Sequence, residues 1–163
     1  MRRFSLLVAA TLTSFAFATP AFAAATSAVT AVSVVKPVAL SKLQDMDFGT
    51  LTFAGFTGTR TIVLSRAGAI TCAADIVCSG IGKQARFNLT GSKQNTILIT
   101  YSGGTLSNGT DSIPFTPDGQ ATMTLVNNGS PGTNFDVGGS LSVSSALVGG
   151  IYTGTMSVTA DYQ

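Results

Sequence analysis

Short runs of alternating apolar and polar residues, separated by turn residues, follow one another along most of this chain. "ARFNLTG" at 85–91 and "NTILITYS" at 95–102 are two such runs, and Gly103-Gly104, Asn108-Gly109 and Pro131-Gly132 mark turns. No window of helical length repeats its apolar residues with a helical period. A period of two is typical of half-buried strands. Many short strands with turns at this spacing predict an all-β fold, an antiparallel sandwich.

Residues 1–23 have the layout of a secretory signal peptide. Arg2 and Arg3 precede an apolar run, and Pro20 is followed by the small-x-small triplet at 21–23. The run is too short and too often interrupted by Thr and Ser for a membrane-spanning helix, which needs about 20 mostly apolar residues. We expect cleavage between Ala23 and Ala24, leaving one mature domain without a membrane span. The paired arginines also fit a twin-arginine export signal.

The composition of the mature chain leaves few groups that could do chemistry. Residues 24–163 contain seven Lys or Arg and seven Asp, and the sequence has no Glu, His or Trp. Catalytic arrangements built on His are therefore excluded, and we expect neither an enzyme nor a cofactor. The cations are scattered singly, which argues against nucleic-acid binding. A surface of near-zero net charge does little to keep copies of the chain apart, so self-association is permitted.

Asp45 and Asp47 are the only acidic residues that lie close together in sequence. On a strand they would share a face, where they could bind a hard cation such as calcium. A solvated polar face before Phe48 is the favoured interpretation, and we expect no metal site.

Cys72 and Cys78 are the only cysteines. In an exported protein such a pair predicts a disulfide. Two thiols without a His supply too few ligands for zinc. Because the loop between them is short, chain entropy gives the bond only about 2 kcal/mol.

The run at 150–162 in "GGIYTGTMSVTADYQ" also has the period of a half-buried strand. Its apolar side consists of Gly150, Tyr152, Gly154, Met156, Val158, Ala160 and Tyr162. An antiparallel sandwich must protect the free backbone edges of its outer strands. One solution is to accept a strand from a neighbouring molecule, whose main chain pairs with the edge while alternate side chains fill pockets.

Residues 24–35 are uncharged and rich in Val, Ala and Thr. Pro37 limits any continuous pairing to an edge or a break. Within Thr26 to Val35 a donated strand could present either of two faces, and the sequence does not choose between them. One face consists of Ala28, Thr30, Val32 and Val34, and the other of Val29, Ala31, Ser33 and Val35.

The two ends of the chain resemble those of chaperone–usher pilus subunits, which are single incomplete immunoglobulin-like domains. The shared features are an aromatic residue, Tyr162, at the next-to-last position and Gly150 as the fourteenth residue counted back from Gln163. The stretches "VVKPVALSKLQDMDFGT", "ARFNLTG" and "VGGSLSV" with "GGIYTGT" are also similar to a family of small secreted proteobacterial domains of unknown function with pilin-like character.

The resemblance implies an immunoglobulin-like β-sandwich over 36–163 that is completed by a donated strand. Residues 24–35 would be the donor strand, above all Ala28, Val29, Thr30, Ala31, Val32 and Val34. The acceptor groove would be lined by Gly150, Tyr152, Met156, Val158 and Tyr162. Partners would be other copies of the chain or related subunits, a periplasmic chaperone and an outer-membrane usher.

We therefore expect a structural subunit of a surface pilus or fimbria that assembles by donor-strand exchange and supports adhesion or biofilm formation. It would be exported, pass through the periplasm of a Gram-negative cell and end at the cell surface or outside the cell. The alternative is a monomeric secreted sandwich that its own N-terminal strand completes. Its loops at 72–78 or 127–136 would then bind a glycan or another surface partner.

Overall fold

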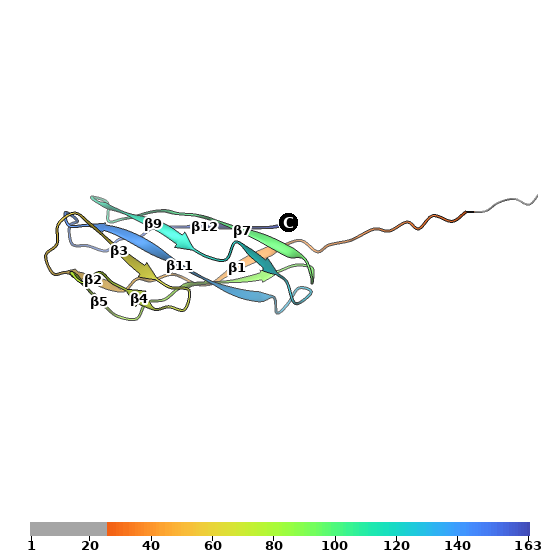
Figure 1. Cartoon of the computed structure of the whole chain (residues 1–163), viewed down its shortest axis with the longest axis horizontal. Coiled ribbons are helices and arrows are strands. Elements are labelled where there is room, and N and C mark those ends of the chain that lie inside the picture. Colours follow the sequence, from red (N-terminus) through yellow and green to blue (C-terminus); the bar gives the residue numbers. More distant parts are fainter. Residues whose placement is uncertain (1–25) are drawn as a thin grey trace, which may run out of the picture. The chain divides into compact units, whose positions relative to one another are not determined.

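A computed structural model describes residues 26–163 of the chain. Over this range the chain forms strands and turns but no helix. Nothing in the described part is a helix long and apolar enough to cross a membrane. Residues 26–33 form no strand and are exposed, and the strands lie in a compact unit, Val34–Gln163 (Figure 1). The predicted signal peptide and its cleavage site between Ala23 and Ala24 lie outside the described residues.

Twelve strands are described, most of them four to seven residues long. In chain order they are β1 (Ala39–Gln44), β2 (Thr50–Phe53), β3 (Thr59–Leu64), β4 (Ile70–Thr71), β5 (Ile76–Ser79), β6 (Ala85–Thr90), β7 (Thr96–Ser102), β8 (Gly104–Ser107), β9 (Ser112–Asp118), β10 (Thr122–Thr124), β11 (Thr133–Ser144) and β12 (Ser157–Tyr162).

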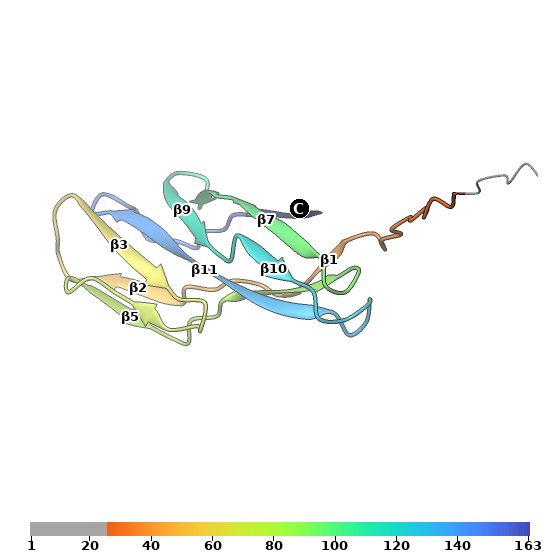
Figure 2. The same ribbon diagram turned by 45° about the vertical axis from the view of Figure 1, so that its right-hand side comes forward.

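The strands form three antiparallel sheets (Figures 1 and 2). The largest has the order β1-β6-β11-β3-β4, and β9, which also pairs with β11, carries β8. A three-stranded sheet has the order β10-β7-β12, and β2 and β5 pair with each other. The predicted all-β, antiparallel fold is therefore confirmed and is compatible with a β-sandwich. Its immunoglobulin-like form stays a prediction.

The long strand β11 joins the two halves of the largest sheet. Its first half pairs with β6 and its second half with β3. Gly138 and Gly139 stand where the partner changes. A Cβ on Gly138 would lie 2.2 Å from the carbonyl oxygen of Leu64, and one on Gly139 would lie 2.8 Å from that of Thr116. Only glycine lets the neighbouring backbones approach this closely.

Two apolar clusters that meet along β11 make up the core. In the first, side chains of β6 and β11 pack with those of β7, and β1 and β12 contribute partly buried residues. In the second, side chains of β3, β9 and β11 pack with those of β2 and β5. Full burial of one such Leu or Ile contributes about 1.5–3 kcal/mol. The largest fully buried side chains are Ile62, Leu64, Leu89, Ile97, Ile99, Leu125, Val137 and Val143.

The C-terminal run differs in part from its prediction. Its even-numbered side chains from Met156 to Tyr162 alternate in burial as expected, but the strand covers only Ser157–Tyr162. In the part of the predicted run that precedes β12, the described residues pair only through an isolated bridge between Thr153 and Ser107. The prediction of a continuous strand from residue 150 is wrong, because the glycines at 149, 150 and 154 bring no side chains that would stabilise a ladder.

Two strands were not predicted at all. β4 and β5 lie in the cysteine region, which the sequence indicated only as a loop. β4 is two residues long, and β5 pairs with β2, which lies well before it in the chain. β4 forms a short hairpin with β3, and β5 is fixed by pairing with the more distant β2, so neither strand has a long pattern of its own.

Candidate functional site

A groove of about 920 Å³ opens between two stretches of chain, residues 42–53 and residues 147–156. We call it the apolar groove, the first stretch its first wall and the second stretch its second wall. Side chains from β6, β9 and β11 form its floor, namely Ala85, Phe87, Ile113, Phe115 and Leu141. All five belong to the buried core. The groove is therefore an opening into the core of the domain.

The first wall begins where β1 separates from its partner. The pairing of β1 with β6 shifts between Lys42 and Gln44, which leaves Leu43 as an extra residue that is 55% exposed. A bulge of this kind bends a strand and disrupts its ladder locally, and the one pair beyond it is Gln44 with Arg86. Backbone hydrogen bonds of 2.8 and 2.9 Å between Asp47 and Lys83 then hold the chain in place. Beyond them β2 pairs with β5 on one edge, and no other described strand pairs with it.

The second wall is held at three points. Thr153 and Ser107 exchange backbone hydrogen bonds of 2.8 and 3.0 Å. The backbone N–H of Val148 donates to the Asp111 carboxylate over 2.9 Å, and the Tyr152 hydroxyl donates to the Val148 carbonyl over 2.7 Å. Loss of solvent around the Tyr152 hydroxyl and the negative charge of Asp111 raise the pKa of Tyr152. These bonds fix a segment that would otherwise be an irregular loop.

Aromatic and sulfur-containing side chains line the boundary between the groove and the core. Phe48 in the first wall packs edge-on against Phe115, with ring centroids 6.1 Å apart. Phe115 retains 8% exposure although it belongs to the core. Met46 and Met156, one in each wall, pack against both core clusters. Methionine side chains adapt to irregular gaps, so these walls could adjust to an inserted segment.

Two strands with a free edge continue the groove beyond its walls. β1 pairs with β6 and β12 pairs with β7, and neither has a second partner among the described strands. The unpaired N–H and C=O groups of such edges are a template for another strand. The chain thus presents two backbone edges, with an apolar opening beside them.

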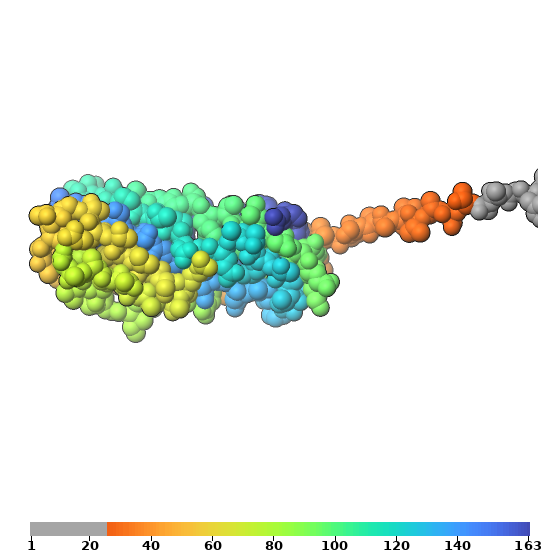
Figure 3. All heavy atoms as spheres, in the orientation of Figure 1, coloured from red at the N-terminus to blue at the C-terminus, as the bar shows by residue number. Residues whose placement is uncertain are grey.

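A ring of hydrogen bonds fastens these two edges together at one end. The N–H of Lys36 donates to the Ser92 hydroxyl over 2.6 Å, and the N–H of Ser92 donates to the Tyr162 hydroxyl over 2.7 Å. The Tyr162 hydroxyl in turn donates to the Lys36 carbonyl over 2.5 Å. We call this the Lys36–Ser92–Tyr162 ring. It lies at the end of β12, which is at the surface of the compact unit (dark blue in Figure 3).

The structure places the predicted groove residues in three different settings. Gly150, Tyr152 and Met156 line the apolar groove. Val158 packs against the first core cluster. Tyr162 packs against the same cluster through its aromatic ring and closes the hydrogen-bonded ring with its hydroxyl.

The predicted donor segment has no regular structure where it is described. Residues 26–35 form no strand, and their side chains are exposed throughout. Val29, Val32 and Val34 are among the most exposed large apolar residues of the described chain. Ala24 and Ala25, at the start of the segment, lie outside the described residues.

The candidate calcium ligands do not form a site together. Asp45 pairs with Lys42 at 2.6 Å, and Asp47 accepts a hydrogen bond of 2.8 Å from the Gly49 N–H. Within residues 26–163 no three acidic, cysteine or histidine side chains gather as metal ligands would. Each carboxylate has a local partner, Lys42 for Asp45 and the Gly49 N–H for Asp47.

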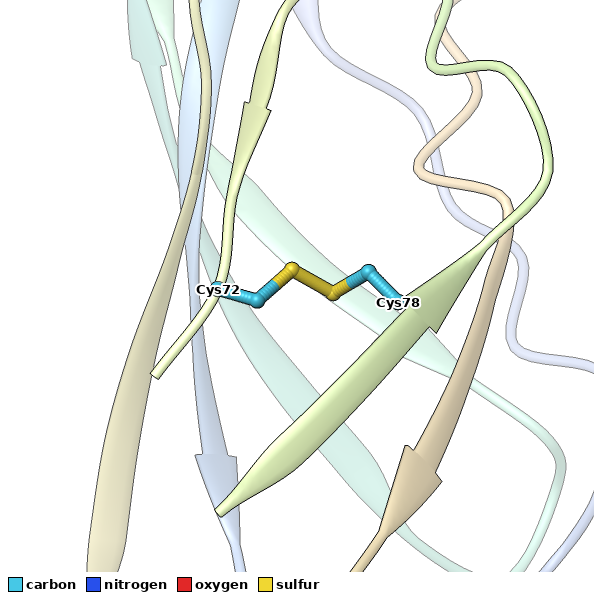
Figure 4. Close-up of a disulfide and its surroundings, with 2 residues drawn as sticks. All are labelled: Cys72 and Cys78. Carbon is cyan, nitrogen blue, oxygen red and sulfur yellow. A yellow bond between two sulfur atoms is a disulfide. The ribbon is translucent and has the colours of Figure 1, made fainter. Parts of the chain in front are cut away.

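Cys72 and Cys78 form the predicted disulfide, with their Cα atoms 6.4 Å apart (Figure 4). Cys72 directly follows β4, in the largest sheet, and Cys78 belongs to β5, in the two-stranded sheet. The enclosed loop carries Asp75, which accepts hydrogen bonds of 2.7 and 3.0 Å from Arg60 of β3. The bond therefore ties β2 and β5, which include part of the first wall, to the largest sheet.

The first wall and the floor of the groove were not predicted from the sequence. Asp45 and Asp47 were expected on a solvated polar face before Phe48, and nothing in that pattern indicated that the stretch borders an opening. Ser92 lies between the two predicted runs at 85–91 and 95–102 and had no predicted role. The penultimate Tyr162 was the one signal that pointed to the ring, without naming its partners.

Residues 38–162 match the family described as Domain of unknown function (DUF4402). The chain belongs to the DUF4402 family. The matched range covers every strand of the DUF4402 domain and both walls of its groove, and leaves out the predicted donor segment. No curated protein and no solved structure matched the chain. The resemblance to pilus subunits stays a prediction.

Proposed function

We propose that this DUF4402 domain is a structural subunit of a surface pilus or fimbria, and that its subunits assemble by donor-strand exchange. The observation that carries the proposal is the apolar groove, which reaches the core between stretches of free backbone edge. An extended segment fits such a place, because main-chain hydrogen bonds supply affinity and alternate side chains fill the groove. The resulting fibre would support adhesion or biofilm formation.

The segment 26–35 of another copy suits the groove in composition and in length. It carries no charge, and its exposed valines would each gain about 1.5–3 kcal/mol on full burial. Fully extended, these ten residues span about 33 Å. The strand in the first wall, β2, has four residues, so the segment is longer than the strand that it would lie beside.

An open groove also accounts for the partners that we propose. A domain with an exposed opening into its core and little net charge is prone to associate through any apolar edge. A periplasmic chaperone would cover the groove after export, and an outer-membrane usher would bring the next subunit. The segment 26–35 would then replace the chaperone.

The test uses the mature chain 24–163, a form that lacks residues 24–35, and a synthetic peptide of residues 24–36. We expect the mature chain to form oligomers that grow with concentration, and the shortened form to stay monomeric and bind the peptide. Light scattering after size-exclusion chromatography measures the size of the oligomers, and calorimetry measures peptide binding.

A control peptide carries Ala31→Asp and Val32→Asp, which place a charge on each face of the strand and should abolish binding. A mature chain that stays monomeric and takes up no peptide would contradict the pilus proposal. That result would favour the monomeric binding module.

A further inference from the structure

The seam between β1 and β12 is narrow, and the Lys36–Ser92–Tyr162 ring fastens it at the end of β12. Cα atoms of the two strands come within 8 Å of each other. A strand hydrogen-bonded to both would need them about 9.5 Å apart, twice the spacing of neighbouring strands. Where these Cα atoms come so close, the seam has no room for a third strand, and the ring holds the two strands together.

The other end of the groove is unobstructed. A Cβ added to Gly149 would have no described atom within 4 Å. Ile151 beside it is 85% exposed, and Val148 is 48% exposed. The second wall is therefore accessible at this end, and an extended segment can approach it from there.

The chain's own N-terminal segment joins the domain at the closed end. It runs into Lys36, whose N–H and C=O are both held by the ring, and Pro37 fixes the next backbone angle. To fill its own groove, the segment would have to turn back at Lys36 and run between β1 and β12. Its length is no obstacle, since ten residues reach about 33 Å and the six residues of β1 span about 20 Å.

We infer that the Lys36–Ser92–Tyr162 ring keeps the chain's own segment out of the apolar groove and so reserves the groove for residues 26–35 of a second copy. The inserted segment comes from the Gly149 end. This inference rests on the proposed function and adds the device that makes strand exchange intermolecular.

The experiment compares the mature chain with a Tyr162→Phe, Ser92→Ala double variant, which loses all three hydrogen bonds of the ring. The matched control is Tyr101→Phe, because the Tyr101 hydroxyl donates to the Gln120 carbonyl over 2.9 Å and takes no part in the ring. Each protein is refolded over a series of concentrations. Hydrogen exchange of the amides at 42–53 and 147–156 reports filling of the groove, and light scattering reports association.

In the mature chain and the control, we expect protection of the groove amides only at concentrations where oligomers form. In the double variant, protection should persist in the monomer. The ratio of monomer to oligomer should rise about tenfold, the effect of roughly 1.4 kcal/mol from the lost bonds. Thermal unfolding shows whether the double variant is folded. If it is not, the concentration series of the mature chain still tests whether the chain's own segment fills the groove.

The peptide of residues 24–36 is offered to each protein as well. If the double variant assembles like the mature chain and both take up this peptide, the inference is overturned and the proposed function stands. A mature chain whose groove is protected at every concentration also overturns the inference, because its own segment then fills the groove. Absence of both protection and peptide uptake in all three proteins overturns the proposed function itself.

Discussion

The Tyr162 hydroxyl donates a hydrogen bond to the backbone carbonyl of Lys36, which lies 126 residues earlier in the chain. The same hydroxyl accepts a hydrogen bond from the N–H of Ser92, in the turn between β6 and β7. One side chain thus fastens the last strand both to the residues before the first strand and to the turn that connects β6 with β7.

Removal of this hydroxyl should therefore weaken the domain. In Tyr162→Phe the partly buried Ser92 N–H loses its acceptor, which we expect to lower the free energy of unfolding by about 1–3 kcal/mol. Urea unfolding of dilute, monomeric protein measures the change. Tyr101→Phe, which loses one hydrogen bond in an exposed setting, should cost less. Equal losses in the two variants would mean that the ring adds nothing to stability.

Gly138→Ala should be severely destabilising. The added Cβ would lie 2.2 Å from the Leu64 carbonyl oxygen, so that β11 and β3 would have to move apart. We expect a loss of more than about 2 kcal/mol, in the range of other overpacked sites. Gly149→Ala is the matched control, because no described atom lies within 4 Å of its Cβ. Thermal unfolding of both variants measures the difference, and similar melting temperatures would contradict the prediction.

Loss of the disulfide should have a moderate effect. Because Cys72 and Cys78 have a sequence separation of 6, chain entropy predicts a loss of about 2 kcal/mol in the free energy of unfolding of a Cys72→Ala, Cys78→Ala variant. Because the bond ties β2 and β5 to the largest sheet, hydrogen exchange should rise first at 50–53 and 76–79. Uniform exchange along the whole chain would show that the bond does not act on this part in particular. Chemical unfolding measures the total loss in the free energy of unfolding.

Stability should fall in acid through Asp136. Hydrogen bonds from Arg86 hold the pKa of Asp136 below its ordinary value, with bond lengths of 2.7 and 3.1 Å. The pair therefore stabilises the folded state above the ordinary Asp pKa of about 3.9, and this contribution is lost as the pH falls through the lowered folded pKa.

Asp136→Asn should consequently cost about 1 kcal/mol at neutral pH and much less in strong acid. Urea unfolding over a pH series measures it. The control is Asp45→Asn, since the Asp45 side chain is 81% exposed. If the free energy of unfolding of Asp136→Asn depended on pH in the same way as that of the unaltered protein, Asp136 would not be the group that lowers stability in acid.

The strands with the clearest local alternation could be predicted from the sequence. β6 and β7 occupy the runs around Gly91-Ser92-Lys93, and the terminal run keeps its expected apolar side. A period of two depends only on which residues face the core, and this information is local. The disulfide was predictable for a similar reason, because the chain offers no other thiol.

The groove could be predicted only in part, because its walls are set by pairing between distant segments. The bulge at Leu43 shifts the register between β1 and β6, and no residue pattern near Leu43 indicates it. The bridge between Thr153 and Ser107 joins a glycine-rich stretch to β8. Gly150, Tyr152 and Met156 were assigned to the groove from one wall alone, whereas Phe48 and Phe115 emerged only from the fold.

The ring at Lys36 also has a mechanical consequence. A pull on the residues before Lys36 reaches the ring first and then β1, whose hydrogen bonds to β6 are perpendicular to the strand axis. Tension along that axis loads those bonds in shear, so they must fail together rather than open one after another. The bonds at Lys36 would yield before them, which makes Tyr162 the first point at which a stretched chain gives way.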